Sequence, residues 1–85
     1  MQRYKILWVD DEIDLLKPYV LTLQEKNYQI DTFNNPYSIL EYIDENNDFD
    51  LILLDENMPG KSGLNLIKDI KERKPFIPII MITKN

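Results

Sequence analysis

Short apolar runs alternate along the chain with stretches in which apolar residues recur every three or four positions. The runs at 6–9 and 51–54 are continuously apolar, and 77–82 is interrupted only by a proline, so we expect three buried strands there. The stretch 28–33 alternates apolar and polar residues instead, which predicts a half-exposed strand at a sheet edge. Trp8 lies inside the first run, and a core position is expected for it.

Three helices are predicted between these strands, over 13–26, 35–48 and 64–74. Pro18 fits the first helix only if it lies in the first turn, because deeper in a helix it removes a hydrogen bond. The second helix opens on Asn35-Pro36, which supplies a capping side chain and a first-turn proline. The residues expected to face the core are Ile13, Leu16, Val20 and Leu23, then Ile39, Leu40 and Ile43, then Leu64, Ile67 and Ile70.

The order of these elements predicts the fold class. Strands and helices alternate from end to end with connections so short that the strands must pair in parallel through helices. Right-handed crossovers then give an open α/β sheet. No linker, internal repeat or low-complexity tract interrupts the pattern, so residues 1–85 are interpreted as one domain.

Composition narrows the chemistry. The 85 residues include no Cys and no His, which excludes a disulfide framework, thiol catalysis and the commonest metal ligand. The 15 acidic and 10 basic residues give a net charge of −5, which disfavours nucleic acid as a direct partner. The sequence has no apolar run long enough for a membrane span, and 1–5 is too polar to open a signal peptide. We expect a cytoplasmic protein without a membrane partner.

Polar residues follow three of the predicted strands directly. Asp10 and Asp11 come after the first, Asp55 after the third and Thr83 after the fourth. The carboxyl ends of parallel strands share one edge of the sheet, so these side chains are expected to meet there. Each one alone has an ordinary structural role, as a helix cap, a turn residue or a strand-end hydroxyl. Together, the carboxylates would repel one another by roughly 4 kcal/mol per close pair, which a bound cation would offset.

Oxygen ligands alone suit a hard divalent ion, Mg²⁺ or Mn²⁺. Mg²⁺ uses one or two carboxylates and leaves room for phosphate oxygens. An Asp carboxylate beside such an ion can attack a phosphoryl group and form an aspartyl phosphate. In that case the hydroxyl of Thr83 is expected to hydrogen-bond a phosphoryl oxygen.

Three segments resemble the receiver domain of two-component response regulators. Trp8-Val9-Asp10-Asp11-Glu12 resembles the acidic pocket after the first strand of that family, and Leu53–Gly60 resembles its phosphoacceptor strand and loop. Met81-Ile82-Thr83 resembles the end of its fourth strand, which carries a switch Thr or Ser. The resemblance implies a flavodoxin-like receiver fold and a signalling domain that accepts a phosphoryl group from a sensor histidine kinase.

The resemblance also implies a role for each residue of the site. Asp55 would be the phosphoacceptor, Asp11 a direct Mg²⁺ ligand and Asp10 a ligand acting largely through water. Asn57 would give its backbone carbonyl to the metal, and Thr83 would bind the phosphoryl group and couple it to loop movement. Such a domain is not an enzyme with an external substrate, although it takes part in its own phosphotransfer and dephosphorylation.

The chain departs from the receiver pattern after the fourth strand. A receiver continues with a helix, a strand and a helix, so the sequence is interpreted as the first part of a receiver whose remaining third, or an output domain, lies elsewhere. The apolar strand 77–82 would then be an open edge, which predicts a homodimer or an exchange of elements through it. The segments 6–16 and 54–60 are similar to the PorX type of regulator, which controls protein secretion in Bacteroidetes.

Two alternatives remain open. The first is an aspartate-nucleophile phosphatase of the haloacid dehalogenase kind, which also places an Asp after a parallel strand and uses Mg²⁺. It needs a second Asp two residues later, where this chain has Asn57. The second is an interaction module with a receiver-like fold whose acidic pocket binds no metal and accepts no phosphate.

Overall fold

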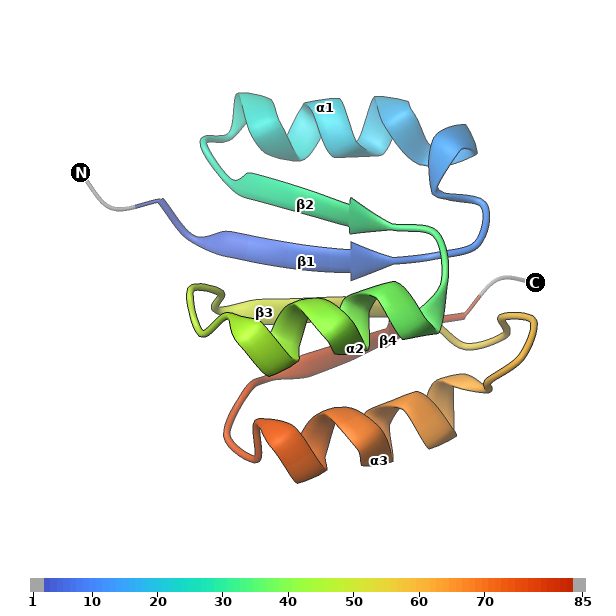
Figure 1. Ribbon diagram of the computed structural model, residues 1–85. Helices are drawn as coiled ribbons and strands as arrows, with labels where there is room; N and C mark the ends of the chain where they lie inside the picture. The colour runs from blue at the N-terminus through green and yellow to red at the C-terminus, as the bar shows by residue number, and fades with distance from the viewer. Residues whose placement is uncertain (1–2, 84–85) are drawn as a thin grey trace.

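The computed structural model describes residues 3–83. Strands and helices alternate along this part of the chain, as the sequence pattern predicts (Figure 1). The longest helix has 11 residues, and no helix within 3–83 is long and apolar enough to cross a membrane. The elements are β1 (Lys5–Val9), a 3₁₀ turn η1 (Ile13–Leu16), α1 (Lys17–Glu25), β2 (Gln29–Phe33), α2 (Pro36–Glu45), β3 (Leu51–Asp55), α3 (Gly63–Arg73) and β4 (Ile79–Ile82).

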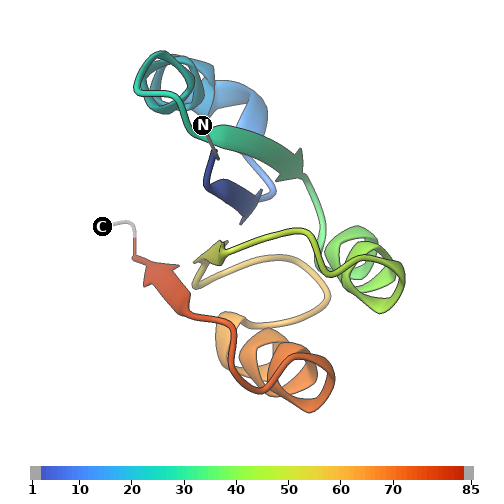
Figure 2. The ribbon, with the colours of Figure 1, turned by 90° about the vertical axis from the view of Figure 1, so that its left-hand side faces the viewer.

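The four strands form one parallel sheet in the order β2-β1-β3-β4. The expected open parallel α/β sheet is therefore confirmed for the described residues, with β2 at an edge as its alternating pattern predicts. Helix α1 lies on one face of the sheet, and α2 and α3 lie on the other (Figure 2). All four strands consequently point their carboxyl ends at the same edge, where the residues predicted to form the site follow them.

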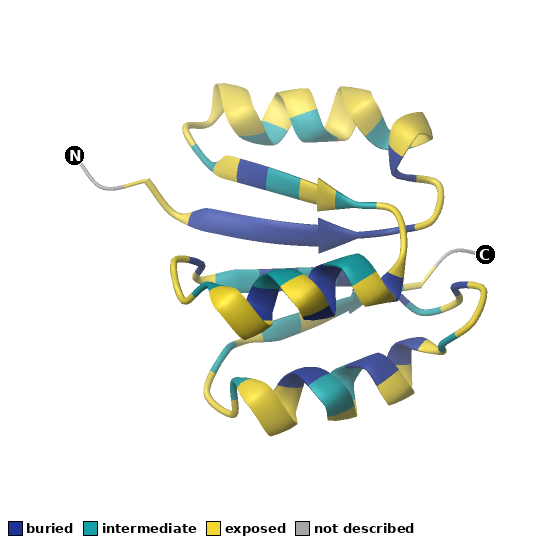
Figure 3. Ribbon diagram, in the orientation of Figure 1, coloured by how far each residue is buried: buried dark blue, intermediate teal, exposed yellow. Residues whose placement is uncertain are grey.

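The core has one layer on each face of the sheet. The larger layer joins alternate residues of β1 and β3 to the inward faces of α2 and α3, and the smaller one lies under α1 and contains Trp8, as expected. Strand β1 is buried along its whole length (Figure 3). The side chains of the larger layer are Leu7, Val9, Ile39, Leu40, Ile43, Phe49, Ile52, Leu54, Met58, Leu66 and Ile70.

The first helix starts differently from the prediction. Residues 13–16 form a 3₁₀ turn, and the α-helix begins only at Lys17. Pro18 explains the change, because it has no N–H to bond to the carbonyl four residues before it. It therefore lies in the first turn of α1, where a proline is tolerated. Ile13 is buried, whereas the other apolar residues predicted to face the core are only half-buried, namely Leu16, Val20 and Leu23.

Two further expectations for apolar residues need correction. Leu64 is 68% exposed, because α3 presents Leu66 and Ile70 to the sheet and Leu64 lies on the opposite side of the helix. The fourth strand begins at Ile79 rather than at position 77 and is only partly buried. Ile77 closes the turn after α3 by donating its N–H to the Lys74 carbonyl (3.3 Å). Ile80 is 52% exposed. Its neighbours Ile79 and Met81 pack against the larger core layer, so Ile80 faces the other side of the sheet.

A polar cluster that the sequence analysis did not single out holds the amino end of the sheet. The ammonium of Lys5 on β1 lies 2.9 Å from a carboxylate oxygen of Asp48 and 3.3 Å from one of Asp31, and it also hydrogen-bonds the Tyr42 hydroxyl. Burial acts to lower the pKa of Lys5, but the hydrogen bonds to Tyr42, Asp48 and Asp31 outweigh it and raise the pKa. In return, the hydrogen bond from Lys5 lowers the pKa of Asp48. This cluster joins β1, β2 and α2 at the end of the sheet opposite the predicted site.

Candidate functional site

The register of the sheet brings the predicted site carboxylates together. Val9 pairs with Leu54 across β1 and β3, so Asp10 and Asp55 are the next residues on two adjacent strands. Asp10 is fully buried and Asp55 is 4% exposed, whereas Asp11 is exposed to solvent. One carboxylate oxygen from each of these three residues lies within 4.8 Å of the other two. The part of the chain from 3 to 83 has no other such group of three acidic side chains.

Backbone hydrogen bonds orient the two buried carboxylates. Asp10 Oδ1 accepts the N–H of Glu12 at 2.8 Å, and Asp55 Oδ1 accepts the N–H of Asn57 at 3.3 Å. In both cases the carboxylate accepts the N–H of the residue two positions later in the chain, as Asp side chains do in turns. The N–H of Asp10 itself donates to the carbonyl of Phe33 at 3.0 Å, which fixes this residue to the end of β2. The edge of the sheet that carries the carboxylates of Asp10, Asp11 and Asp55 is called the acidic edge below. It is therefore held in place before any ligand binds.

The loop between β3 and α3 wraps beside the carboxylates. Its two ends are joined, because the N–H of Gly63 donates to the carbonyl of Glu56 at 2.8 Å. A Cβ at Gly63 would lie 3.0 Å from backbone atoms of Glu56, so the backbone would have to shift to admit a side chain where α3 approaches the end of β3. Met58 is buried in the larger core layer, while its neighbour Asn57 is exposed. Asn57 is thus held at the edge between two anchored residues.

Thr83 lies at the same edge. Asp55 pairs with Ile82 across β3 and β4, and Thr83 is the residue after Ile82. The N–H of Glu56 donates to the carbonyl of Ile82 at 3.1 Å, which links the residue after Asp55 to the residue before Thr83. Thr83 is exposed, so its hydroxyl is accessible to a group bound at the edge. All five predicted site residues therefore lie at or just beyond the ends of strands at one edge. Their three carboxylates form a close group, and Asn57 and Thr83 are on the adjoining chain segments.

The donor set of this edge fits a hard divalent cation. The three carboxylates offer only oxygen ligands, and Asn57 adds a backbone carbonyl in the adjoining loop. Two of the three charges are buried side by side, which costs free energy unless a cation or proton offsets it. A group such as Mg²⁺ would take two or three of these oxygens and keep open positions for water or a phosphoryl oxygen.

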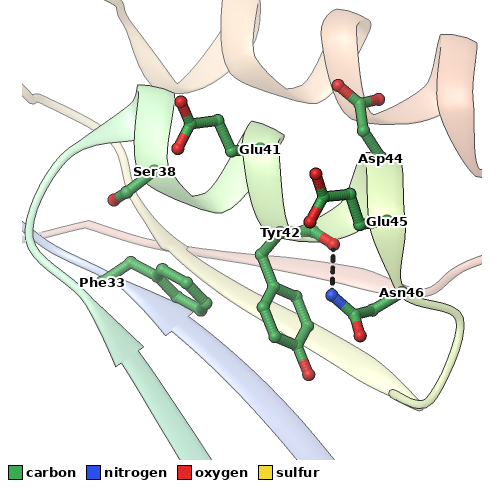
Figure 4. A pocket seen from close by; sticks show the side chains of 7 residues that line it. All are labelled: Phe33, Ser38, Glu41, Tyr42, Asp44, Glu45 and Asn46. Carbon is green, nitrogen blue, oxygen red and sulfur yellow. Dashed lines mark hydrogen bonds between the residues drawn. The ribbon is translucent and has the colours of Figure 1, made fainter.

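The structure also has a groove beside α2 that is separate from the acidic group. It encloses about 480 Å³ and is lined by Phe33, Ser38, Glu41, Tyr42, Asp44, Glu45 and Asn46 (Figure 4). Its carboxylates do not converge as those of the acidic edge do, and Asp44 is paired with the Arg73 side chain at 2.7 Å. None of the predicted site residues lines this groove.

One residue beside the site was missed by the sequence analysis. Tyr37, in the first turn of α2, donates its hydroxyl hydrogen to the carbonyl of Gly60 in the β3–α3 loop at 3.3 Å. The capping pair Asn35-Pro36 gave the position of this helical turn, but nothing in the sequence showed that the turn lies next to the loop.

Comparison with known proteins identifies what this arrangement is similar to. A family model described as the response regulator receiver domain matches residues 6–85. The transcriptional regulatory protein ResD of Bacillus subtilis is 41% identical over 80 residues, which cover 93% of this chain and 32% of ResD. The chain thus spans about a third of the length of that relative.

Solved structures show the same fold. A response regulator of Thermotoga maritima, TrrA, solved in complex with Mg²⁺ and BeF, is 39% identical with a TM-score of 0.84, over 94% of this chain and 69% of that one. A chemotaxis response regulator of Vibrio cholerae is 30% identical with a TM-score of 0.87, over 99% of this chain and 71% of that one. Both structures therefore match nearly the whole of this chain. The chain in turn spans about two thirds of each of these structures.

Proposed function

Because this chain belongs to the response regulator receiver domain family, we propose that it accepts a phosphoryl group on Asp55 in a Mg²⁺-dependent reaction, with a histidine kinase as the donor. Receiver domains are the phosphoacceptor signalling domains of two-component systems, so the family supplies the class of reaction. The observation that supports the residue assignment is the close group of Asp10, Asp11 and Asp55 carboxylates at one edge of the sheet.

In the proposed reaction, a carboxylate oxygen of Asp55 attacks the phosphorus of the donor. The new O–P bond makes an aspartyl phosphate, while the P–N bond of a phosphohistidine breaks. The electron pair of that bond stays on the ring nitrogen, and the imidazole leaves as a neutral ring because its other nitrogen already carries a proton. The hydrogen bond from the Asn57 N–H to Asp55 Oδ1 holds the carboxylate in a fixed orientation during the attack. Little covalent chemistry is required of the protein, so positioning and charge stabilisation supply most of the rate.

The same edge would hold the metal. Asp11 and Asp55 would supply carboxylate oxygens. Asn57 would supply its carbonyl, and Asp10 would act through a water molecule. When bound, Mg²⁺ neutralises charge on the carboxylates and on the phosphoryl oxygens. The exposed position of Asp11 beside two buried carboxylates keeps the site accessible to the ion and to the phosphodonor. Mn²⁺ has the same preference for oxygen ligands and is expected to substitute.

Thr83 is the proposed sensor of the phosphoryl group. Its hydroxyl, one residue beyond the pair Asp55–Ile82, would donate a hydrogen bond to a phosphoryl oxygen. Movement of Thr83 would carry the signal to an output domain, and the similarity to a transcriptional regulatory protein supports such a partner. As a stoichiometric phosphoacceptor, the domain takes part in its own phosphorylation and dephosphorylation and does not turn over an external substrate.

Labelling with a small phosphodonor tests this proposal. Incubation with acetyl phosphate and Mg²⁺ should add one phosphoryl group to the protein by intact mass, and Asp55→Asn should abolish the addition. Asp14→Asn is the matched control, because Asp14 is an exposed carboxylate in η1 outside the acidic group. A label that persists in Asp55→Asn would refute the assignment of the acceptor.

Labelling, together with a phosphatase assay, separates the proposal from its alternatives. An interaction module without phosphotransfer predicts no label on the wild-type protein and no response to Mg²⁺. A phosphatase predicts sustained hydrolysis of a phosphomonoester such as para-nitrophenyl phosphate, whereas a receiver accumulates at most one phosphoryl group per chain. Rapid and continued release of nitrophenol, with no phosphorylated protein detectable by intact mass, would overturn the proposed function.

A further inference from the structure

We propose that Tyr37 is a positioning residue for the metal site: its hydroxyl fixes the β3–α3 loop so that the carbonyl of Asn57 is preorganised for Mg²⁺. The inference rests on the proposed function, because it takes Asn57 as a metal ligand. It concerns a contact between α2 and the loop that belongs to neither the acidic group nor the phosphoacceptor.

The contact joins two elements that are distant in sequence. The Tyr37 hydroxyl lies 3.3 Å from the carbonyl oxygen of Gly60, 23 residues later in the chain. Gly60 has a φ of 90°, and a Cβ placed on it would lie 3.4 Å from the Tyr37 hydroxyl oxygen and 3.6 Å from its ring. The ring of Tyr37 therefore packs against the bare Cα of Gly60. Figure 1 shows the first turn of α2 beside the loop that follows β3.

The helix end that carries Tyr37 is rigidly built. Asn35 Oδ1 accepts the N–H groups of Tyr37 at 3.0 Å and Ser38 at 2.9 Å, and Pro36 is fully buried in the first turn. Tyr37 is nevertheless 56% exposed, so burial in the core does not account for its position. A fixed backbone with an outward side chain is suited to hold a neighbouring loop.

The loop depends on a small number of such attachments. The bond from Gly63 to Glu56 closes its base, and the side chain of Met58 anchors its middle in the core. The contact between Gly60 and Tyr37 restrains the segment between Met58 and the start of α3. The carbonyl of Asn57 belongs to the peptide group that joins it to Met58, so its direction also depends on how the loop runs on from Met58 to Gly60. Groups that orient metal ligands in this way commonly affect metal affinity.

The Mg²⁺ dissociation constant provides a readout that a merely stabilising role would not change. As long as nearly all molecules are folded, a loss of overall stability does not alter the affinity of the folded protein for the ion. Isothermal titration calorimetry with Mg²⁺ should show an affinity about threefold weaker in Tyr37→Phe, the effect expected for one neutral hydrogen bond. Tyr19→Phe, which alters an exposed tyrosine of α1, is the matched control and should bind like the wild type.

Amide hydrogen exchange in the metal-free protein gives the second readout. Residues 57–61 should exchange about threefold faster in Tyr37→Phe than in the wild type, with no change in α1. An unchanged Mg²⁺ affinity in Tyr37→Phe, or unchanged exchange in the loop, would overturn the inference and leave the proposed function intact. A wild-type protein that binds no Mg²⁺ at millimolar concentration would instead overturn the proposed function itself.

Discussion

Val9 on β1 and Leu54 on β3 are register partners in the sheet, and each is followed directly by a buried aspartate. Two apolar strands therefore end at the same level and deliver Asp10 and Asp55 side by side. A shift of the register by one residue would move one carboxylate to the other face of the sheet, which the buried apolar residues of both strands prevent. The packing of the core thus determines the geometry of the acidic edge.

The response of stability to Mg²⁺ tests the acidic edge. At a Mg²⁺ concentration ten times the dissociation constant, the wild type should gain about 1.4 kcal/mol of unfolding free energy, or roughly 5–10 °C in melting temperature. Asp55→Asn removes one charge from the group, so it should be more stable than the wild type without metal, by about 1 kcal/mol. Thermal melts followed by circular dichroism, with EDTA or MgCl₂, measure both effects.

Asp55→Asn should raise the stability measured in EDTA and reduce the further gain that Mg²⁺ gives, and this combination makes the test specific. A variant that was simply misfolded would lose stability with and without metal. Asp14→Asn should keep the full Mg²⁺ response, because Asp14 is exposed and outside the group. An equal Mg²⁺ shift in Asp55→Asn would mean that the ion binds elsewhere.

The Lys5 cluster predicts a dependence of stability on acid. The hydrogen bond from Lys5 lowers the pKa of Asp48 below its ordinary value of 3.8, so this contribution is present above pH 3.8 and lost as the pH falls through the folded-state value. Lys5→Met should lower the urea midpoint at pH 7, and its difference from the wild type should shrink below pH 3.8. Urea denaturation from pH 2.5 to 7 measures the change. A difference that stays constant to the lowest pH would contradict this account.

At alkaline pH the same cluster predicts a loss of stability. Burial opposes the charge of Lys5, but its hydrogen bonds raise the pKa above the ordinary 10.5, so the contribution is complete below pH 10.5. Burial also raises the pKa of Tyr42 above its ordinary 10.0, which acts in the same direction. Wild-type stability should therefore fall as the pH rises beyond these values. Melting temperatures that remain level from pH 9 to 12 would exclude the effect.

Substitution of Gly63 tests the close approach of α3 to β3. Gly63→Ala should destabilise the fold by about 2 kcal/mol, because the new Cβ would lie 3.0 Å from backbone atoms of Glu56, which cannot move aside cheaply. Helix propensity alone predicts the opposite sign, since Ala favours a helix over Gly by about 1 kcal/mol. Urea denaturation of the variant decides between the two.

Removal of the α2 cap should weaken the helix that carries Tyr37. Asn35→Ala leaves two N–H groups of the first turn without their acceptor and should cost about 1 kcal/mol of unfolding free energy. Asn35→Asp keeps a side-chain acceptor at the positive end of the helix and should remain near the wild type. The comparison is again made by chemical denaturation, and equal losses in both variants would show that the side-chain amide, rather than an acceptor oxygen, is needed.

The element order and the acidic edge were predictable from the sequence, since both follow from local patterns. Continuous apolar runs marked β1 and β3, and the carboxylates directly after them marked the edge. The strand order β2-β1-β3-β4 does not follow from local patterns, because a crossover helix can place the next strand on either side of its predecessor. It is the order of the flavodoxin-like fold that the resemblance implied. The chemical roles of Asp10, Asp11, Asp55, Asn57 and Thr83 stay predictions that the experiments above test.

The errors of prediction have tertiary causes. Leu64 fits the apolar spacing of α3. The side that a helix turns towards the sheet depends on all of its apolar residues together, however, and Leu66 and Ile70 lie on that side. Ile77 is apolar like the strand after it, yet its N–H is used by the turn that ends α3. The Lys5 cluster joins residues up to 43 positions apart, and no local pattern reports such a pairing.

The hydrogen bond between the Glu56 N–H and the Ile82 carbonyl connects the end of β3 to the end of β4 through main-chain atoms alone. Since neither side chain takes part, the identities of Glu56 and Ile82 are unconstrained by this connection. We expect exchange of Glu56 for another polar residue to preserve communication between the two strands. Position 56 can therefore vary without loosening the attachment of β4 to the rest of the sheet.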